Sequence, residues 1–243
     1  MIRSNTLAAG ALTFALAASG GASGLEAAPI VFTGCLAGSG IQTACSDGDL
    51  VTSANDYSDA LLRWTVSGDS SGGPWTYQYT FSYVDNVRGG GPGPVDDVII
   101  ELSASFGPND LIDASDNCTT TTIGTFAPSP GSNPHPDLPG SVYGLKCSTV
   151  TDVNPFVWTI TTMRAPVWGD FYAKTGGKVN NWGTASNAGF LAADPLAAAG
   201  NGSVGDHILR PDTIVRQSPE PASLVLFGLA LGLVGHTVRR KRA

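Results

Sequence analysis

A stretch of nine residues, 75–83, constrains the fold of this chain more than any other feature. It holds five aromatic residues that alternate with four polar ones at a strict period of two. Successive side chains of an extended strand point to opposite faces, so all five rings lie on one face and the polar groups on the other. The stretch therefore predicts a half-buried antiparallel β-strand whose aromatic face is turned into a core.

Further segments extend the β pattern along the chain. Residues 98–106 alternate in a similar way, and the Gly- and Pro-rich linker before them predicts a long-looped hairpin with 75–83. No segment between 25 and 215 keeps a helical period. Seven or eight short strands with Gly and Pro between them predict an all-β fold, namely a two-sheet β-sandwich that is jelly-roll-like. The other strands are expected at 30–36, 60–66, 121–126, 156–163, 168–174 and 208–209.

The distribution of charge excludes one class of partner. The 243 residues include 13 basic and 20 acidic ones, and five of the basic residues lie at the two ends of the chain. Between residues 25 and 218, eight basic residues remain against 19 acidic ones. Nucleic-acid binding needs clustered Lys and Arg to displace counterions from phosphates, so this acidic region argues against a nucleic-acid partner.

The N-terminus predicts export. Residues 1–24 run from one cation, Arg3, through an apolar stretch at 7–18 into small residues at 22–24, which is typical of a secretory signal peptide. The apolar part has about 12 residues, too few to span the hydrocarbon of a bilayer as a helix. We expect residues 25–215 to form the exported, β-rich domain.

The C-terminus contains three features in a fixed order. A Pro-Glu-Pro motif is followed by the uncharged apolar span 222–238 and then by a basic tail. The span predicts one C-terminal transmembrane helix at the short limit for a bilayer, and the basic tail orients it with the tail in the cytoplasm. The motif is Pro219, Glu220 and Pro221, and the tail is Arg239, Arg240, Lys241 and Arg242.

This ordered trio at 218–243 resembles the PEP-CTERM sorting signal of exported proteins of Gram-negative bacteria. The resemblance implies an intermediate anchored in the inner membrane and processing near the motif by an exosortase, a membrane-embedded cysteine transpeptidase. It also implies a final location in the cell envelope, at the outer surface or outside the cell, and an association with exopolysaccharide and biofilm matrix. A plain tail anchor is the alternative interpretation of the same residues.

Four cysteines lie in the expected exported domain. An oxidising compartment favours disulfides, and four cysteines allow three pairings. The most local loops are those that pair Cys35 with Cys45 and Cys118 with Cys147, and these are the pairs that we expect. A structural zinc site or a redox thiol pair would call for Cys-x-x-Cys spacing, which the sequence does not contain.

Aspartates form the only pattern that suggests a cofactor. Asp110, Asp113 and Asp116 form the densest group of oxygen ligands, and residues 46–49 contain a second group. Calcium binds six to eight oxygens, so the first group is the candidate calcium site. The interpretation that we favour is that these aspartates form turns and solvate the surface, so that the protein has no cofactor, and calcium is the alternative.

The histidines do not indicate catalysis. His135 lies in a proline-rich loop, and His207 follows Asp206 near Ser203 without the Gly-x-Ser-x-Gly turn of a serine hydrolase. We therefore expect a protein that is not an enzyme, with a structural, adhesive or exopolysaccharide-associated role.

A carbohydrate-binding module or a glycan-active enzyme on a jelly-roll scaffold is the alternative function. Aromatic rings that stack on sugars must be exposed, whereas rings of a core are buried. The exposure of Trp75, Tyr77 and Tyr79 therefore discriminates between the two expectations, because a buried row favours the first and an exposed row beside a groove favours the second.

Overall fold

The computed structural model describes the central part of the chain. The described residues are 28–53, 57–69, 72–83, 94–129, 134–148, 153–175 and 183–212. The predicted signal peptide 1–24 and the predicted sorting signal 218–243, with its apolar span 222–238, lie outside these ranges. Within the described ranges, no helix is long and apolar enough to cross a membrane.

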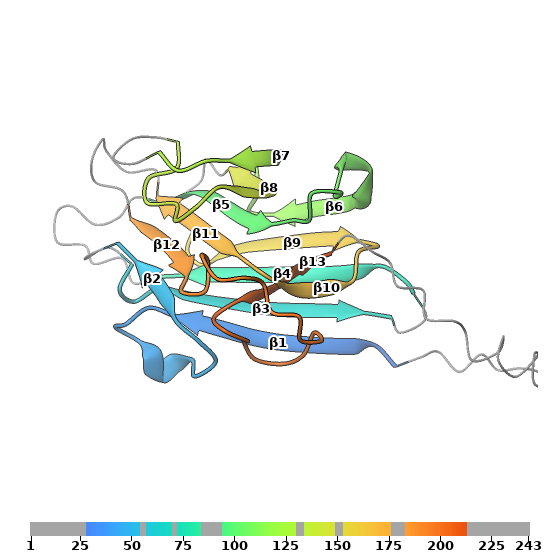
Figure 1. The fold of residues 1–243 in the computed structure, drawn as a ribbon, viewed down its shortest axis with the longest axis horizontal. Coiled ribbons are helices and arrows are strands. Elements are labelled where there is room, and N and C mark those ends of the chain that lie inside the picture. The colour runs from blue at the N-terminus through green and yellow to red at the C-terminus, as the bar shows by residue number, and fades with distance from the viewer. Residues whose placement is uncertain are drawn as a thin grey trace, which may run out of the picture.

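The described residues form thirteen β-strands and two short 3₁₀ turns, η1 and η2 (Figure 1). In chain order the elements are β1 (Ile30–Ala37), η1 (Gln42–Ala44), β2 (Leu50–Thr52), β3 (Leu61–Gly68), β4 (Trp75–Ser82), β5 (Val95–Glu101), η2 (Pro108–Asp110), β6 (Leu111–Asp116), β7 (Thr120–Phe126), β8 (Val142–Ser148), β9 (Phe156–Thr162), β10 (Pro166–Gly169), β11 (Phe171–Thr175), β12 (Thr184–Asn187) and β13 (Ile208–Pro211).

Antiparallel pairing joins these strands into sheets. The first sheet has the order β1-β3-β4-β9-β6, the second has the order β2-β12-β11-β5-β8-β7, and β10 pairs with β13 in a small third sheet. Figure 1 shows the strands of the first sheet running side by side, with β10 and β13 crossing over them. The fold is therefore all-β, as the sequence predicts, and its sheets are consistent with a β-sandwich.

The core lies between the two large sheets, where side chains of both belong to one cluster of buried residues. Tyr77, Tyr79 and Phe81 of β4 are each at most 1% exposed. Phe81 approaches Phe171 of β11 in the other sheet, with ring centroids 5.6 Å apart. The prediction that the aromatic face of 75–83 turns into the core is confirmed.

Bulky rings meet across the first sheet. Tyr79 is opposite Trp64 of β3 on one side and opposite Trp158 of β9 on the other. Trp64 in turn lies opposite Gly34 of β1, where an added Cβ would come 2.2 Å from the indole atom Cζ2. A glycine at position 34 is therefore what gives the Trp64 ring its space.

The predicted hairpin between 75–83 and 98–106 is wrong. β4 pairs with β3 and β9 in the first sheet, whereas β5 pairs with β8 and β11 in the second sheet. Alternation determines which face of a strand is buried, but it does not determine which strand pairs with it. The two strands belong to different sheets and contribute to the same core from those sheets.

β5 also differs from the half-buried strand that its alternation predicts, because both of its faces are covered. Val98 and Ile100 belong to the main core, while Ile99 packs into a second buried cluster with Tyr172 and Phe190. Loop residues such as Leu138 complete this second cluster on the outer face of the second sheet. A strand buried on both faces reads as a continuous apolar run, as residues 98–100 do.

The predicted single strand at 168–174 is interrupted at Asp170. The chain leaves β10, which pairs with β13, and continues as β11, which pairs with β5 and β12. The backbone N–H of Asp170 donates to Glu101 Oε2 at 2.9 Å, and Asn187 Nδ2 donates to Asp170 Oδ1 at 2.9 Å. These side-chain contacts fix Asp170 at the point where the chain changes sheets.

Both predicted disulfides are present, Cys35–Cys45 and Cys118–Cys147. The first joins β1 to the segment after η1, and the second joins the turn before β7 to β8. Two disulfides fit an oxidising, extracytoplasmic compartment.

Candidate functional site

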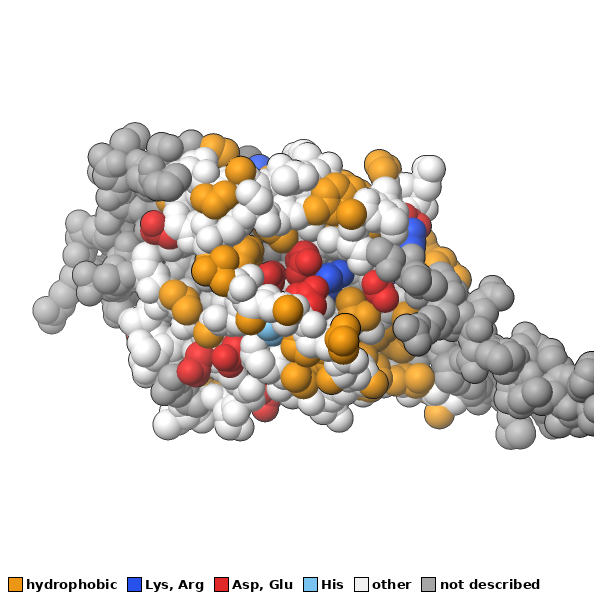
Figure 2. Space-filling model, viewed as in Figure 1, with side chains coloured by type: hydrophobic (Ala, Val, Ile, Leu, Met, Phe, Trp, Pro, Cys, Tyr) orange, Lys and Arg blue, Asp and Glu red, His pale blue; other side chains and the backbone are white. Residues whose placement is uncertain are grey.

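Five ionisable side chains from four segments meet at one place, which we call the polar cluster. Glu101 ends β5, Asp170 lies between β10 and β11, Asp194 follows β12, and His207 and Arg210 belong to the segment of β13. The His207 and Arg210 side chains are 2% and 7% exposed, whereas that of Asp194 is 33% exposed. Figure 2 shows acidic side chains beside a basic one and near a histidine, in the middle of the face in view.

Arg210 holds two of the carboxylates. Its Nη2 donates to Glu101 Oε1 at 3.2 Å and to Asp194 Oδ2 at 2.6 Å. Its Nη1 donates to Ser103 Oγ at 3.1 Å. Gly169 makes this placement sterically feasible, because an added Cβ there would lie 1.9 Å from Arg210 Nε.

Hydrogen bonds hold both the backbone and the side chain of Asp170. Besides the bonds to Glu101 and from Asn187, Phe171 N–H donates to Asn187 Oδ1 at 2.8 Å, which orients the Asn187 amide. The amide nitrogen therefore faces Asp170 Oδ1. The position of this carboxylate oxygen is fixed by the fold.

His207 directs an unpaired nitrogen at the carboxylates. Its Nδ1 lies 3.2 Å from the carbonyl oxygen of Val204, and since a carbonyl can only accept, Nδ1 carries the hydrogen. Its Nε2 lies 3.7 Å from Asp170 Oδ1 and 3.9 Å from Asp194 Oδ1 and makes no hydrogen bond. In its neutral form the imidazole presents a lone pair to two carboxylate oxygens, and in its protonated form it faces the same oxygens as an ion-pair partner.

Burial perturbs the acids of the cluster. It raises the pKa of Glu101, and it raises the pKa of Asp170 to about 7, with the neighbouring Glu101 and Asp194 carboxylates adding to the effect on Asp170. The Asn187 hydrogen bond and the Arg210 charge act in the opposite direction on Asp170. Such a group of carboxylates and one imidazole can share protons near neutral pH or hold a cation.

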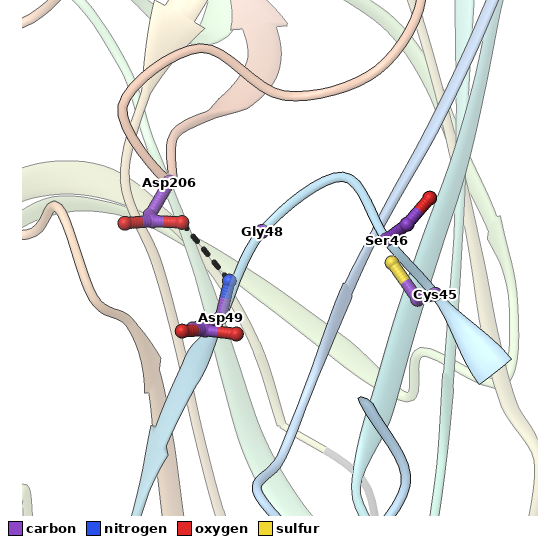
Figure 3. Close-up of a pocket in the computed structure, with 5 residues that line it drawn as sticks. All are labelled: Cys45, Ser46, Gly48, Asp49 and Asp206. Atoms are coloured by element: carbon purple, nitrogen blue, oxygen red, sulfur yellow. Dashed lines mark hydrogen bonds between the residues drawn. The ribbon is translucent and has the colours of Figure 1, made fainter. Parts of the chain in front are cut away.

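A second polar feature is an open pocket beside the first disulfide (Figure 3), lined by Cys45, Ser46, Gly48, Asp49 and Asp206. The backbone N–H of Asp49 donates to Asp206 Oδ1 at 3.0 Å. The neighbouring Asp47 accepts from the backbone N–H of Cys35 through Oδ2 at 3.1 Å. Hydrogen bonds between backbone N–H groups and aspartate side chains therefore join the segment 46–49 to β1 and to the loop before β13.

The three aspartates of the predicted calcium site lie around η2 and β6. Asp110 accepts from Arg164 Nε at 3.0 Å and from the backbone N–H of Gly107 at 2.8 Å, and the Arg164 guanidinium lowers its pKa. Within the described residues, the groups of three ligating side chains that lie within 4.8 Å of one another do not include Asp110, Asp113 or Asp116. Calcium at these residues stays an untested alternative.

The structure also shows the surroundings of Ser203, His207 and His135, which were considered above as candidate catalytic residues. Ser203 Oγ donates to the backbone carbonyl of His207 at 2.7 Å, so this hydroxyl is bonded to the backbone and not to the imidazole. His135 is buried and packs edge-on against Phe126 and Tyr172, and burial lowers its pKa. It packs against two members of the second buried cluster.

The sequence interpretation missed Glu101, Asp170, Asp194 and Arg210. One signal was available, because Asp170 is a charged residue inside the otherwise apolar and aromatic run at 168–173. Such a residue calls for a buried partner, although nothing in the sequence identifies that partner.

The remaining predicted residues, which form the Pro-Glu-Pro motif at 219–221 and the basic tail at 239–242, lie outside the described residues. No family model matches this chain, and no characterised protein or solved structure shows significant similarity to it.

Proposed function

We propose that this chain is an exported protein of the cell envelope or extracellular matrix that is sorted and processed through residues 218–243. The observation that carries the proposal is the ordered trio of Pro-Glu-Pro motif, apolar span and basic tail. Its partners are an exosortase-type enzyme and, transiently, the inner membrane. The two disulfides support export, because they are stable in an oxidising compartment.

We further propose that the exported domain has a structural, adhesive or exopolysaccharide-associated role and is not an enzyme. The burial of the aromatic row in β4 supports this reading over a carbohydrate-binding module or glycan-active enzyme on a jelly-roll scaffold. Tyr77 and Tyr79 donate their hydroxyls to the backbone carbonyls of Arg164 and Leu209, at 2.7 and 2.8 Å. Trp75, at the end of the row, is half-buried and stacks on Phe32.

The sorting proposal is tested by replacing Glu220 in the bacterium that produces the protein. Sorting by the Pro-Glu-Pro motif predicts that Glu220→Ala blocks maturation, so that the full-length form accumulates in the inner membrane. Ser218→Ala, one residue before the motif, is the matched control and should mature normally. Mass spectrometry of the C-terminal peptide from membrane and surface fractions reads the result.

A plain tail anchor predicts a different pattern. One acidic residue outside the bilayer contributes little to insertion, so Glu220→Ala would then change nothing, and intact residues 222–243 would remain on most molecules of the unsubstituted protein. That outcome would refute processing and leave an anchored envelope protein.

A further inference from the structure

The polar cluster has an unbalanced charge. The cluster contains three carboxylates, those of Glu101, Asp170 and Asp194, and one guanidinium, that of Arg210, which contacts Glu101 and Asp194. Between them lies His207 Nε2, which is buried and has no hydrogen-bond partner. Buried polar atoms are nearly always paired, and buried charges are paired or coordinate metals.

A second buried ionic group of the same domain shows what a balanced arrangement looks like. Lys174 is 1% exposed and pairs with Asp96 and Asp97, and Asp97 also contacts Lys146 at 3.4 Å and accepts from Ser148 Oγ at 2.7 Å. Two cations here face two carboxylates. With its three carboxylates ionised and His207 neutral, the polar cluster instead carries two negative charges more than its one guanidinium balances.

We propose that the polar cluster binds one divalent transition-metal ion, such as Zn²⁺, through Asp170, Asp194 and His207. Three ligand atoms, one from each residue, lie within 4.8 Å of one another. Tetrahedral ligands at about 2.1 Å from a metal lie about 3.4 Å apart. The 3.7 and 3.9 Å separations from His207 Nε2 to the two carboxylates thus need to shorten by only a few tenths of an ångström.

The surroundings of the three ligands match those of metal-binding side chains. A ligating histidine donates its other ring N–H to a carbonyl or carboxylate, and ligating carboxylates are themselves hydrogen-bonded. His207 Nδ1 faces the Val204 carbonyl, Asn187 donates to Asp170, and Arg210 donates to Asp194. A divalent ion would also neutralise the charge of the ionised carboxylates that Arg210 leaves unbalanced.

The donor set selects the class of metal. Calcium and magnesium prefer oxygen ligands, whereas an imidazole nitrogen suits zinc and other transition metals. The Asp194 side chain, one-third exposed, places the metal within reach of solvent. Three protein ligands leave a fourth position for water or another ligand.

The test uses the full chain, untagged and with both disulfides formed, stripped of metal with EDTA and titrated calorimetrically with ZnCl₂ and, separately, CaCl₂. The expected result is one Zn²⁺ per chain, bound at least tenfold more tightly than Ca²⁺. Asp194→Asn and His207→Gln should each weaken Zn²⁺ binding at least tenfold. Asp206→Asn and His135→Gln make the same changes outside the cluster and should leave the affinity within twofold.

A measurement on the unsubstituted chain protects the test against variants that fold poorly. With ¹⁵N-labelled histidine, Zn²⁺ should shift the Nε2 resonance of His207 and leave that of His135 in place. Three outcomes would overturn the proposal: no saturable Zn²⁺ binding, equal affinity in all four variants, or an unshifted His207 resonance at saturation. Tighter binding of Ca²⁺ than of Zn²⁺ would overturn the assigned class of metal. The proposal does not depend on the sorting signal, which this experiment leaves untouched.

Discussion

Replacing Tyr79 tests the core of the sandwich at a residue with two separable contributions. Its ring is 1% exposed between Trp64 and Trp158, and its hydroxyl donates to the Leu209 carbonyl of β13 at 2.8 Å. Tyr79→Phe removes only the hydroxyl. Loss of one buried hydrogen bond, with the acceptor left in place, should lower the free energy of unfolding by about 1 to 2 kcal/mol.

Tyr79→Ala removes the ring as well. Truncation of a buried aromatic side chain costs about 3 to 5 kcal/mol, because transfer energy is lost and a cavity remains between the neighbouring indoles. The next residue supplies the matched control, since Thr80 points to the opposite face of β4 and is half-buried. Thr80→Ala should change the free energy of unfolding by less than about 0.5 kcal/mol.

The assay is urea unfolding with both disulfides intact, followed by tryptophan fluorescence. The urea concentration at the midpoint should be highest for Thr80→Ala, lower for Tyr79→Phe and lowest for Tyr79→Ala. The slope of the free energy of unfolding against urea concentration should stay constant. Equal and small effects of Tyr79→Ala and Thr80→Ala would show that the ring is exposed. The reasoning from alternation to a buried face would then be refuted, and the glycan-binding alternative would regain its support.

Three further changes test other parts of the structure. Replacing Cys118 and Cys147 by serine opens the longer disulfide loop, whose sequence separation is 29, against 10 for Cys35–Cys45. In the same unfolding assay, this replacement should cost about 4 kcal/mol, and replacing Cys35 and Cys45 should cost about 3 kcal/mol. The reverse order would contradict the chain-entropy account. Burial lowers the pKa of His135, so the stability that its neutral form provides is present above the unfolded pKa near 6.5 and is lost as the pH falls. His135→Gln should therefore flatten the decline in melting temperature between about pH 7 and 5, and an unchanged decline would place its cause elsewhere. Gly169→Ala should lower the free energy of unfolding by about 1 to 3 kcal/mol, because the added Cβ would overlap the Arg210 guanidinium. Gly124→Ala is the control and should be nearly neutral, because no atom lies within 4 Å of a Cβ added there. Similar costs at both glycines would contradict the packing around β10.

The strands that the sequence predicts best are those with one buried face. β4 and β9 carry aromatic or β-branched residues at period two, and both form in the first sheet close to the expected bounds. Their alternation reflects a local property, the side of the sheet on which each side chain lies. A local property can be read from neighbouring residues alone.

Strand partners and short polar strands are not local properties. The sequence Thr-Ala-Ser-Asn of β12 has no apolar alternation, yet all four residues are buried because the strand is paired on both sides. Its burial depends on β2 and β11, which lie more than a hundred residues before it and nine residues before it, respectively. For the same reason the partner of β4 could not be inferred from its linker to β5.

The polar cluster depends even more strongly on contacts between residues that are distant in the sequence. Its members lie between positions 101 and 210, and each one alone is an ordinary turn or strand residue. Only the change of sheet at Asp170 and the return of β13 beside β10 bring them together. The sequence shows the residue types of the site but not that they lie close together.

The cost of burying these groups argues that stability alone does not explain them. Removing charges from water is expensive, and a buried ionic group replaced by well-packed apolar residues often leaves a protein equally or more stable. The network around Lys174 limits this cost by balancing its charges and pairing its members. The polar cluster pairs its carboxylates with Arg210 and Asn187, but His207 Nε2 has no hydrogen-bond partner and the ionised carboxylates outnumber the guanidinium. An arrangement that is this costly in isolation becomes favourable once a divalent cation joins it, which is why we interpret the cluster as a binding site and not as a fastening between sheets.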